Sequence, residues 1–167
     1  MSRGFIKEGD QEEIPMVPPR AYLPEGVTNY VTQAGMKELL EEKDKLIKEK
    51  DTPDISSESE KRITLNHINA KLQQLNKRIA EAKIVNPNEQ PKNEIRFGAI
   101  ITLKIETTKN IQTLQIVGVD EANLSKGKIS FISPLAKVLM NKKVGDKAVL
   151  KLFKEDRIFE IMDITYR

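Results

Sequence analysis

The sequence predicts an α+β protein in which an antiparallel helical coiled-coil hairpin precedes a small β domain with one short helix. A heptad repeat, a second apolar stripe upstream of it, and β-branched segments beyond residue 95 support this fold class. The heptad positions are Leu65, Ile68, Leu72, Leu75, Ile79 and Ala82. Steps of three and four residues place these side chains on one helix face, which requires a partner helix.

Residues 1–31 precede the hairpin and are expected to form an extended, proline-rich arm. Pro15, Pro18, Pro19 and Pro24 fall within ten positions, and acidic residues come before them. This composition disfavours both helix and strand. The arm is expected either to lie along the body of the protein or to become ordered on a partner.

Residues 32–86 are predicted to form the hairpin. Thr32 is a suitable N-cap for a first helix that runs to about Lys50, and the second helix is expected to run to about Val85. The first helix carries an apolar stripe that consists of Met36, Leu39, Leu40, Leu46 and Ile47. The segment between the helices is too short to do more than turn the chain back, so the hairpin has a tip. Its carboxylates are Asp51, Asp54, Glu58 and Glu60.

Residues 95–167 are predicted to form a curled sheet around one helix. Five segments alternate β-branched with polar residues, which is typical of strands. These segments are 100–105, 111–117, 128–132, 148–153 and 158–165. Residues 134–141 fit a short amphipathic helix that Ser133 would cap.

The composition argues against catalysis by this chain alone. Among its 167 residues there is no cysteine and one histidine, His67, so a thiolate site is excluded and an imidazole site has no partner. No segment is apolar enough to cross a bilayer, and we expect a cytoplasmic protein without membrane contact. The 28 basic and 25 acidic residues give a net charge of +3, which is weak support for DNA binding.

The tip carboxylates have two possible roles. Acidic residues near the start of a helix complement its dipole and keep a turn hydrated. Two carboxylates at the end of a rod could instead hold Mg²⁺, or orient a water molecule on an ion that a partner holds.

Three segments in the second half of the chain form a recognisable series of motifs: IVGVDEAN at residues 116–123, KGKISFISPLAKVLM at 126–140 and NKKVGD at 141–146. With these motifs the second half resembles the C-terminal domain of the bacterial GreA/GreB family of transcription elongation factors. Members of that family place a coiled-coil hairpin ahead of an FKBP-like β domain. The resemblance covers about residues 32–167.

The resemblance implies an accessory factor, not an enzyme, that binds bacterial RNA polymerase as a monomer and inserts the hairpin into the secondary channel. Contact with DNA and RNA would then be indirect, within the elongation complex. The tip of such factors acts on Mg²⁺ in the polymerase active site, and no other cofactor is expected. By this resemblance the tip carboxylates are Asp51, Asp54 and Glu58, and the docking residues are Asp120, Glu121, Ser133 and Pro134.

Two departures from the family lead us to expect a regulator with reduced or absent cleavage stimulation. The first helix has about fifteen fewer residues than those of the cleavage factors, which is roughly 20 Å of helix. The acidic pair is Asp-Thr-Pro-Asp, so its second acid is shorter. The alternatives are a full transcript-cleavage factor that relieves backtracked polymerase and a coiled-coil adaptor unrelated to polymerase. A prolyl isomerase is disfavoured because the chain has no tryptophan to floor a proline pocket.

Overall fold

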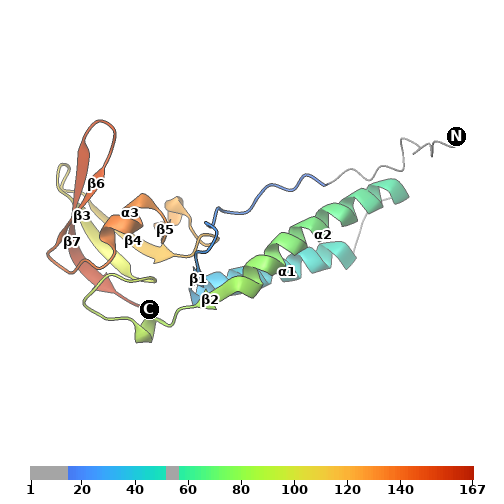
Figure 1. Ribbon diagram of the computed structural model, residues 1–167, viewed down its shortest axis with the longest axis horizontal. Helices are drawn as coiled ribbons and strands as arrows, with labels where there is room; N and C mark the ends of the chain where they lie inside the picture. Colours follow the sequence, from blue (N-terminus) through green and yellow to red (C-terminus); the bar gives the residue numbers. More distant parts are fainter. Residues whose placement is uncertain (1–14, 52–56) are drawn as a thin grey trace.

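The computed structural model describes residues 15–51 and 57–167, and it consists of a helical rod that projects from a small β domain (Figure 1). The rod contains helix α1 (Gln33–Asp51) and helix α2 (Glu58–Glu81). The β domain contains strands β3 to β7 and the short helix α3. This arrangement confirms the predicted fold class. No helix in the described ranges is long and apolar enough to cross a membrane.

Both rod helices begin at side chains that accept backbone hydrogen bonds. The Thr32 hydroxyl accepts from the Gly35 N–H at 2.9 Å, and the Ser57 hydroxyl accepts from the Glu60 N–H at 3.2 Å. Each bond satisfies one of the N–H groups that a first helical turn leaves without a partner. The predicted cap at Thr32 is therefore confirmed.

The seam between α1 and α2 is narrow. Its buried residues are Val31, Leu39, Leu46, Ile68 and Leu75, and the partly buried residues Met36, Leu72, Ile79 and Ala82 pack against them. The expectation that Leu40 and Ile47 also belong to this seam was wrong, because both are exposed. A two-helix contact covers only one row of side chains per helix, and these residues lie beside that row.

A two-stranded parallel sheet forms the base of the rod. Strand β1 (Asn29–Val31) pairs with strand β2 (Ala82–Ile84), with Tyr30 opposite Lys83. The expected helix to Val85 was thus wrong, since α2 ends at Glu81. The expected arm also differs at its end, because residues 29–31 form a strand. At residues 82–84, backbone pairing with residues 29–31 replaces the last turn of the helix that was expected to reach Val85.

The β domain contains a five-stranded sheet in the order β5-β4-β3-β7-β6. Its strands are β3 (Ile100–Ile105), β4 (Ile111–Val117), β5 (Lys128–Ser130), β6 (Lys147–Lys151) and β7 (Asp156–Thr165). Only the β4–β5 pair is parallel. All five predicted strands are present, the first two with the expected bounds, and β5 and β6 are shorter than expected.

Helix α3 (Pro134–Leu139) packs on this sheet and buries Ala136 and Leu139 in its core. Two short 3₁₀ helices, η1 (Pro87–Glu89) and η2 (Leu124–Lys126), lie in the connections. Residues 15–28 have no regular structure and run beside the rod (Figure 1). The part of the predicted arm before residue 15 lies outside the described residues.

Candidate functional site

The tip of the rod carries two of the predicted carboxylates in the described ranges. Asp51 is the last residue of α1 and Glu58 is the first residue of α2, and both side chains are exposed. Glu58 and Glu60 in the first turn of α2 complement the positive end of the helix dipole. The structure therefore leaves both roles open for these acids. Asp54, the third predicted residue, lies outside the described residues.

A metal site would need several ligands close together. Within residues 15–51 and 57–167, no three His, Asp or Glu side chains lie close enough to hold a metal ion. Asp51 and Glu58 are exposed carboxylates on two helix ends, and such groups suit an ion that has further ligands elsewhere.

Asp120, a predicted docking residue, lies at the junction between the rod and the β domain. Its carboxylate accepts from Arg20 Nε at 3.1 Å and is 3.3 Å from Arg78 Nε. The Asp120 side chain is 8% exposed. Two arginines from outside the β domain thus neutralise one nearly buried carboxylate, an arrangement that removes the cost of burying it unpaired.

Arg20 extends this network to α1. Its Nη1 and Nη2 donate to the two carboxylate oxygens of Glu42 at 2.7 and 3.0 Å. The hydrogen bond to Glu42 is the main cause that raises the pKa of Arg20; burial opposes the rise and the charge of Asp120 supports it. The guanidinium stays charged at every pH at which the protein is folded.

Glu121, the next predicted docking residue, is also turned inward. Its carboxylate accepts from the Thr32 hydroxyl and from Lys128 Nζ, the latter at 3.1 Å. Thr32 is the N-cap of α1, so Glu121 joins the start of the rod to the β domain. Its side chain is only 3% exposed.

Two glycines allow the rod and the β domain to approach closely. A Cβ at Gly118 would lie 2.6 Å from the Tyr30 carbonyl oxygen of β1. A Cβ at Gly35 would lie 2.5 Å from Glu121 Oε1. Both distances are shorter than real Cβ contacts: a side chain at position 118 would push on the backbone of β1, whereas one at position 35 would displace only the end of the Glu121 side chain.

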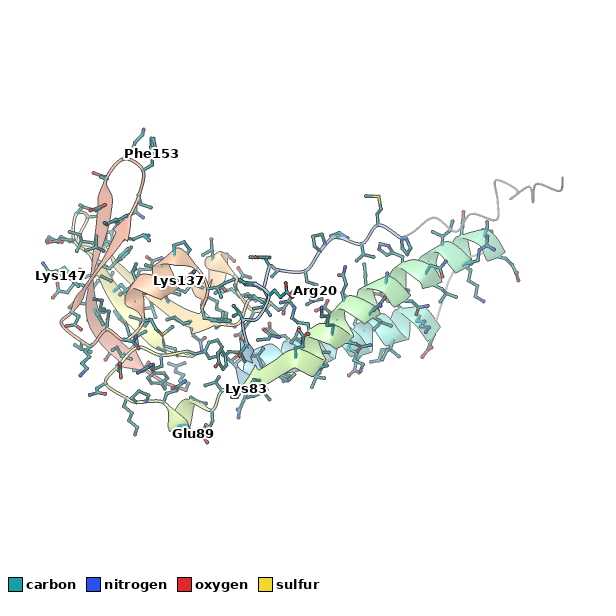
Figure 2. The ribbon with its side chains drawn as sticks, in the orientation of Figure 1. Arg20, Lys83, Glu89, Lys137, Lys147 and Phe153 are labelled. Carbon is teal, nitrogen blue, oxygen red and sulfur yellow. The ribbon has the colours of Figure 1, made fainter. Side chains whose placement is uncertain are left out.

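Ser133 and Pro134, the remaining predicted docking residues, begin α3. The Ser133 hydroxyl accepts from the Ala136 N–H at 3.2 Å and caps the helix, as predicted. Pro134 is exposed, and α3 also presents Lys137 to solvent (Figure 2). Nothing in the structure tests whether a partner contacts these residues, and the docking role stays a prediction.

Arg20 and Arg78 were not among the residues singled out from the sequence. They lie 100 and 42 positions from Asp120, and no periodic pattern links them to it. The only available signal was the acidic pair Asp120–Glu121 after a buried strand end, which implies cationic partners in the fold.

Comparisons with known proteins point to one family. Residues 90–166 match the family model described as transcription elongation factor, GreA/GreB, C-terminal domain. The chain is 33% identical to the transcription elongation factor GreA of Hyphomonas neptunium over 100 residues, which are 60% of this chain and 64% of that protein. It is 28% identical to GreA of Neorickettsia sennetsu over 152 residues, which are 82% of this chain and 96% of that protein.

The chain spans less than two thirds of the length of the Hyphomonas neptunium protein, and the same holds for two further GreA proteins that it matches. Among solved structures, GreA factor homolog 1 of Thermus thermophilus is 23% identical with a TM-score of 0.40, and the match covers 83% of this chain and 99% of that chain. A GreA/GreB factor from Nitrosomonas europaea is 17% identical with a TM-score of 0.42, covering 82% and 98%.

Proposed function

Because the chain belongs to the GreA/GreB family of transcription elongation factors, we propose that it binds bacterial RNA polymerase and regulates elongation through the secondary channel. The observation that carries this proposal is the match of residues 90–166 to the family's C-terminal domain, joined to a projecting rod with an acidic end. The β domain would dock and the rod would enter the channel as part of a monomer.

In this role the tip would act next to Mg²⁺ bound in the polymerase active site. The polymerase ion would supply the Lewis acidity for RNA cleavage. Asp51 and Glu58, and Asp54 by its match to the family pair, would accept hydrogen bonds from water on that ion and orient it. The exposure of Asp51 and Glu58 at two helix ends suits this task, because the chain needs no pocket of its own.

We propose that cleavage stimulation is reduced or absent. Helix α1 has 19 residues and α2 has 24, so the paired rod is limited to about 28 Å by its shorter helix. The second acid of the tip, Asp54, has one methylene fewer than glutamate. A shorter rod with a shorter second acid favours a factor that occupies the channel over one that delivers carboxylates to the metal.

A transcript-cleavage assay on backtracked elongation complexes tests this point. We expect little RNA shortening beyond that of polymerase alone, and the same amount with the Asp51→Ala/Asp54→Ala double variant. Asp44→Ala, which removes an exposed acid from the side of α1, is the matched control. Strong shortening by the wild-type protein that only the double variant loses would instead establish a full cleavage factor.

Binding to polymerase is tested separately by co-elution of the full-length protein with purified core enzyme. Pro134→Glu changes the predicted docking surface, and glutamate is well tolerated at the first position of a helix. We expect weaker co-elution for Pro134→Glu and unchanged co-elution for Gln112→Glu, on an exposed position of β4. Absence of binding by the wild-type protein would refute the proposed function.

An adaptor role has one observation in its favour. Leu40 and Ile47 are seven residues apart on α1 and are 45% and 38% exposed, so they form a second apolar row on the rod. Such a row could pair with another coiled coil. Light scattering of the free protein tests self-association through this row, and a monomer at high concentration would show that the row does not pair with a second copy.

A further inference from the structure

The arm before β1 sends Arg20 into the junction between the rod and the β domain (Figure 2). This single guanidinium binds Glu42 on α1 with two hydrogen bonds and Asp120 of the β domain with a third. Its side chain is 18% exposed. Arginine is suited to this bridge because its donors lie in one rigid plane and reach two carboxylates at once.

The arm is also held by α2. Arg78 Nη2 donates to the Ala21 carbonyl oxygen at 2.6 Å, while Arg78 Nε lies 3.3 Å from Asp120. The Asn29 side-chain amide donates to the Arg78 carbonyl oxygen at 3.1 Å and is itself buried. The arm, both rod helices and the β domain therefore meet through two arginines, Arg20 and Arg78, and two carboxylates, Glu42 and Asp120.

The arm has few apolar contacts that would hold it in place without these polar ones. Met16 and Tyr22, two large apolar side chains of the arm in the described range, are 92% and 76% exposed. Val17, Leu23 and Pro24 are only partly buried. The arm thus lies on the rod chiefly because Arg20 and the Ala21 carbonyl are bound there.

One attachment point of the junction lies at the base of the rod. There the Thr32 hydroxyl donates to Glu121, Tyr30 packs on Phe97 and Phe131, and Gly118 permits close contact. One attachment point allows a rod to turn about it, whereas two separated points fix its direction. The Arg20–Asp120–Arg78 cluster supplies the second point, and one of its two ion pairs, Arg20–Asp120, depends on the arm.

We propose that residues 17–23 form an intramolecular strap that fixes the direction of the rod relative to the β domain, with Arg20 as its positioning residue. Loss of Arg20 releases the arm from Asp120 and Glu42 and leaves Asp120 with Arg78 alone. The rod then samples a range of directions, while the rod and the β domain each keep their own structure. This inference concerns the free protein and does not depend on polymerase binding.

The absence of cysteine makes the proposal directly measurable. Spin labels on cysteines introduced at Lys61, near the tip end of α2, and at Lys137 on α3 report the distance between rod and β domain by pulsed dipolar spectroscopy. Both positions are exposed and lie in helices. The doubly labelled full-length chain is expected to give one narrow distance distribution.

The variant Arg20→Ala is expected to broaden this distribution at least twofold. The matched control Arg96→Ala removes an arginine whose carboxylate partner, Glu94, lies two residues away in the same segment, and it should leave the width unchanged. Arg20→Lys keeps the charge without the planar fork and should give an intermediate width. A width that stays narrow in Arg20→Ala would overturn the proposal.

A second variant guards against misfolding of the first. Glu42→Gln removes only the outer carboxylate of the network and leaves Asp120 paired with both arginines. This variant should broaden the distance distribution less than Arg20→Ala does. Circular dichroism checks that each variant keeps its helix content. If Arg20→Ala fails to fold, a Glu42→Gln distribution as narrow as that of the wild-type protein contradicts the strap.

Discussion

The β domain and the rod differ in what holds them together. Among the described residues, fourteen buried hydrophobic side chains form the core of the β domain, whereas five form the seam of the rod. The rod meets the β domain through charged and polar groups at Asp120 and Glu121, and through ring contacts of Tyr30 on β1 with Phe97 and Phe131. The apolar contacts of a core are non-directional but close-packed, whereas the hydrogen bonds and ion pairs of a junction are few and need a defined geometry. The comparison indicates a close-packed β domain that carries a rod on a small number of contacts.

The largest effect is expected from a cavity in the β domain. Leu103 on β3 is fully buried, and Leu103→Ala should lower the free energy of unfolding by about 3 kcal/mol through lost burial and the cavity left behind. Thermal unfolding followed by circular dichroism in the β region measures it. The control Ile111→Ala, at an exposed position of the neighbouring strand, should cost under about 0.5 kcal/mol. Equal costs for the two variants would contradict a close-packed core.

A smaller effect is expected from the same kind of change in the rod. Leu75→Ala removes a fully buried side chain from the seam, with an expected cost of about 2 kcal/mol because fewer neighbours surround it. Helical ellipticity should melt earlier while the β-domain transition stays in place. The exposed seam neighbour Ile63 supplies the control, Ile63→Ala. A single transition that shifts as a whole would show that the two regions unfold together and would break the comparison.

The sequence was sufficient for features that depend on local patterns. The heptad at Ile68 and Leu75 predicted buried seam positions, since helix periodicity alone decides which face a residue occupies. The Ser133–Pro134 pair likewise predicted the start of α3. Leu40 and Ile47 were assigned wrongly because hydrophobicity alone does not show how wide a two-helix contact is.

Features that depend on distant pairing could not be predicted. Residues 82–84 continue the helical pattern, and only pairing with residues 29–31 makes them a strand. The Arg20–Asp120 bridge joins residues 100 positions apart, and the strand order of the main sheet has no local signal. Of the candidate site, the sequence supplied the tip carboxylates and the acidic pair, but not the arginines that bind that pair.

The junction itself can be probed through backbone contact instead of charge. Gly118→Ala would place a methyl group 2.6 Å from the Tyr30 carbonyl oxygen, which belongs to the backbone and cannot rotate away. We expect a loss of about 1.5 kcal/mol from the displacement of β1. Differential scanning calorimetry measures the loss.

Gly35→Ala is the informative comparison for this variant. Its methyl group would meet Glu121 Oε1, the end of a side chain, and alanine is the better helix former. A smaller loss than for Gly118→Ala is therefore expected. If Gly118→Ala is as stable as the wild-type protein, the rod base does not lie against the β domain as described.

The smallest effect is expected at Tyr166, whose hydroxyl connects the end of β7 to the backbone of the linker that follows the rod. Its hydroxyl accepts from the Arg96 N–H at 2.8 Å and donates to the Glu94 carbonyl oxygen. Tyr166→Phe removes both bonds and should cost about 1 kcal/mol near neutral pH. The exposed Tyr22 gives the matched control, Tyr22→Phe, for which no loss is expected.

The pH dependence of this loss tests whether it comes from the buried hydroxyl of Tyr166. Burial raises the pKa of Tyr166 above its ordinary value of 10.0, so the folded protein favours the neutral phenol. Its contribution is complete below pH 10 and decreases as the pH rises toward the raised pKa, because the unfolded chain releases this proton first. The difference between wild-type protein and Tyr166→Phe should therefore shrink when melting is measured from pH 8 to pH 11. A difference that stays constant over that range would mean that the Tyr166 hydroxyl ionises equally easily in the folded and the unfolded chain, and it would contradict the burial of this hydroxyl.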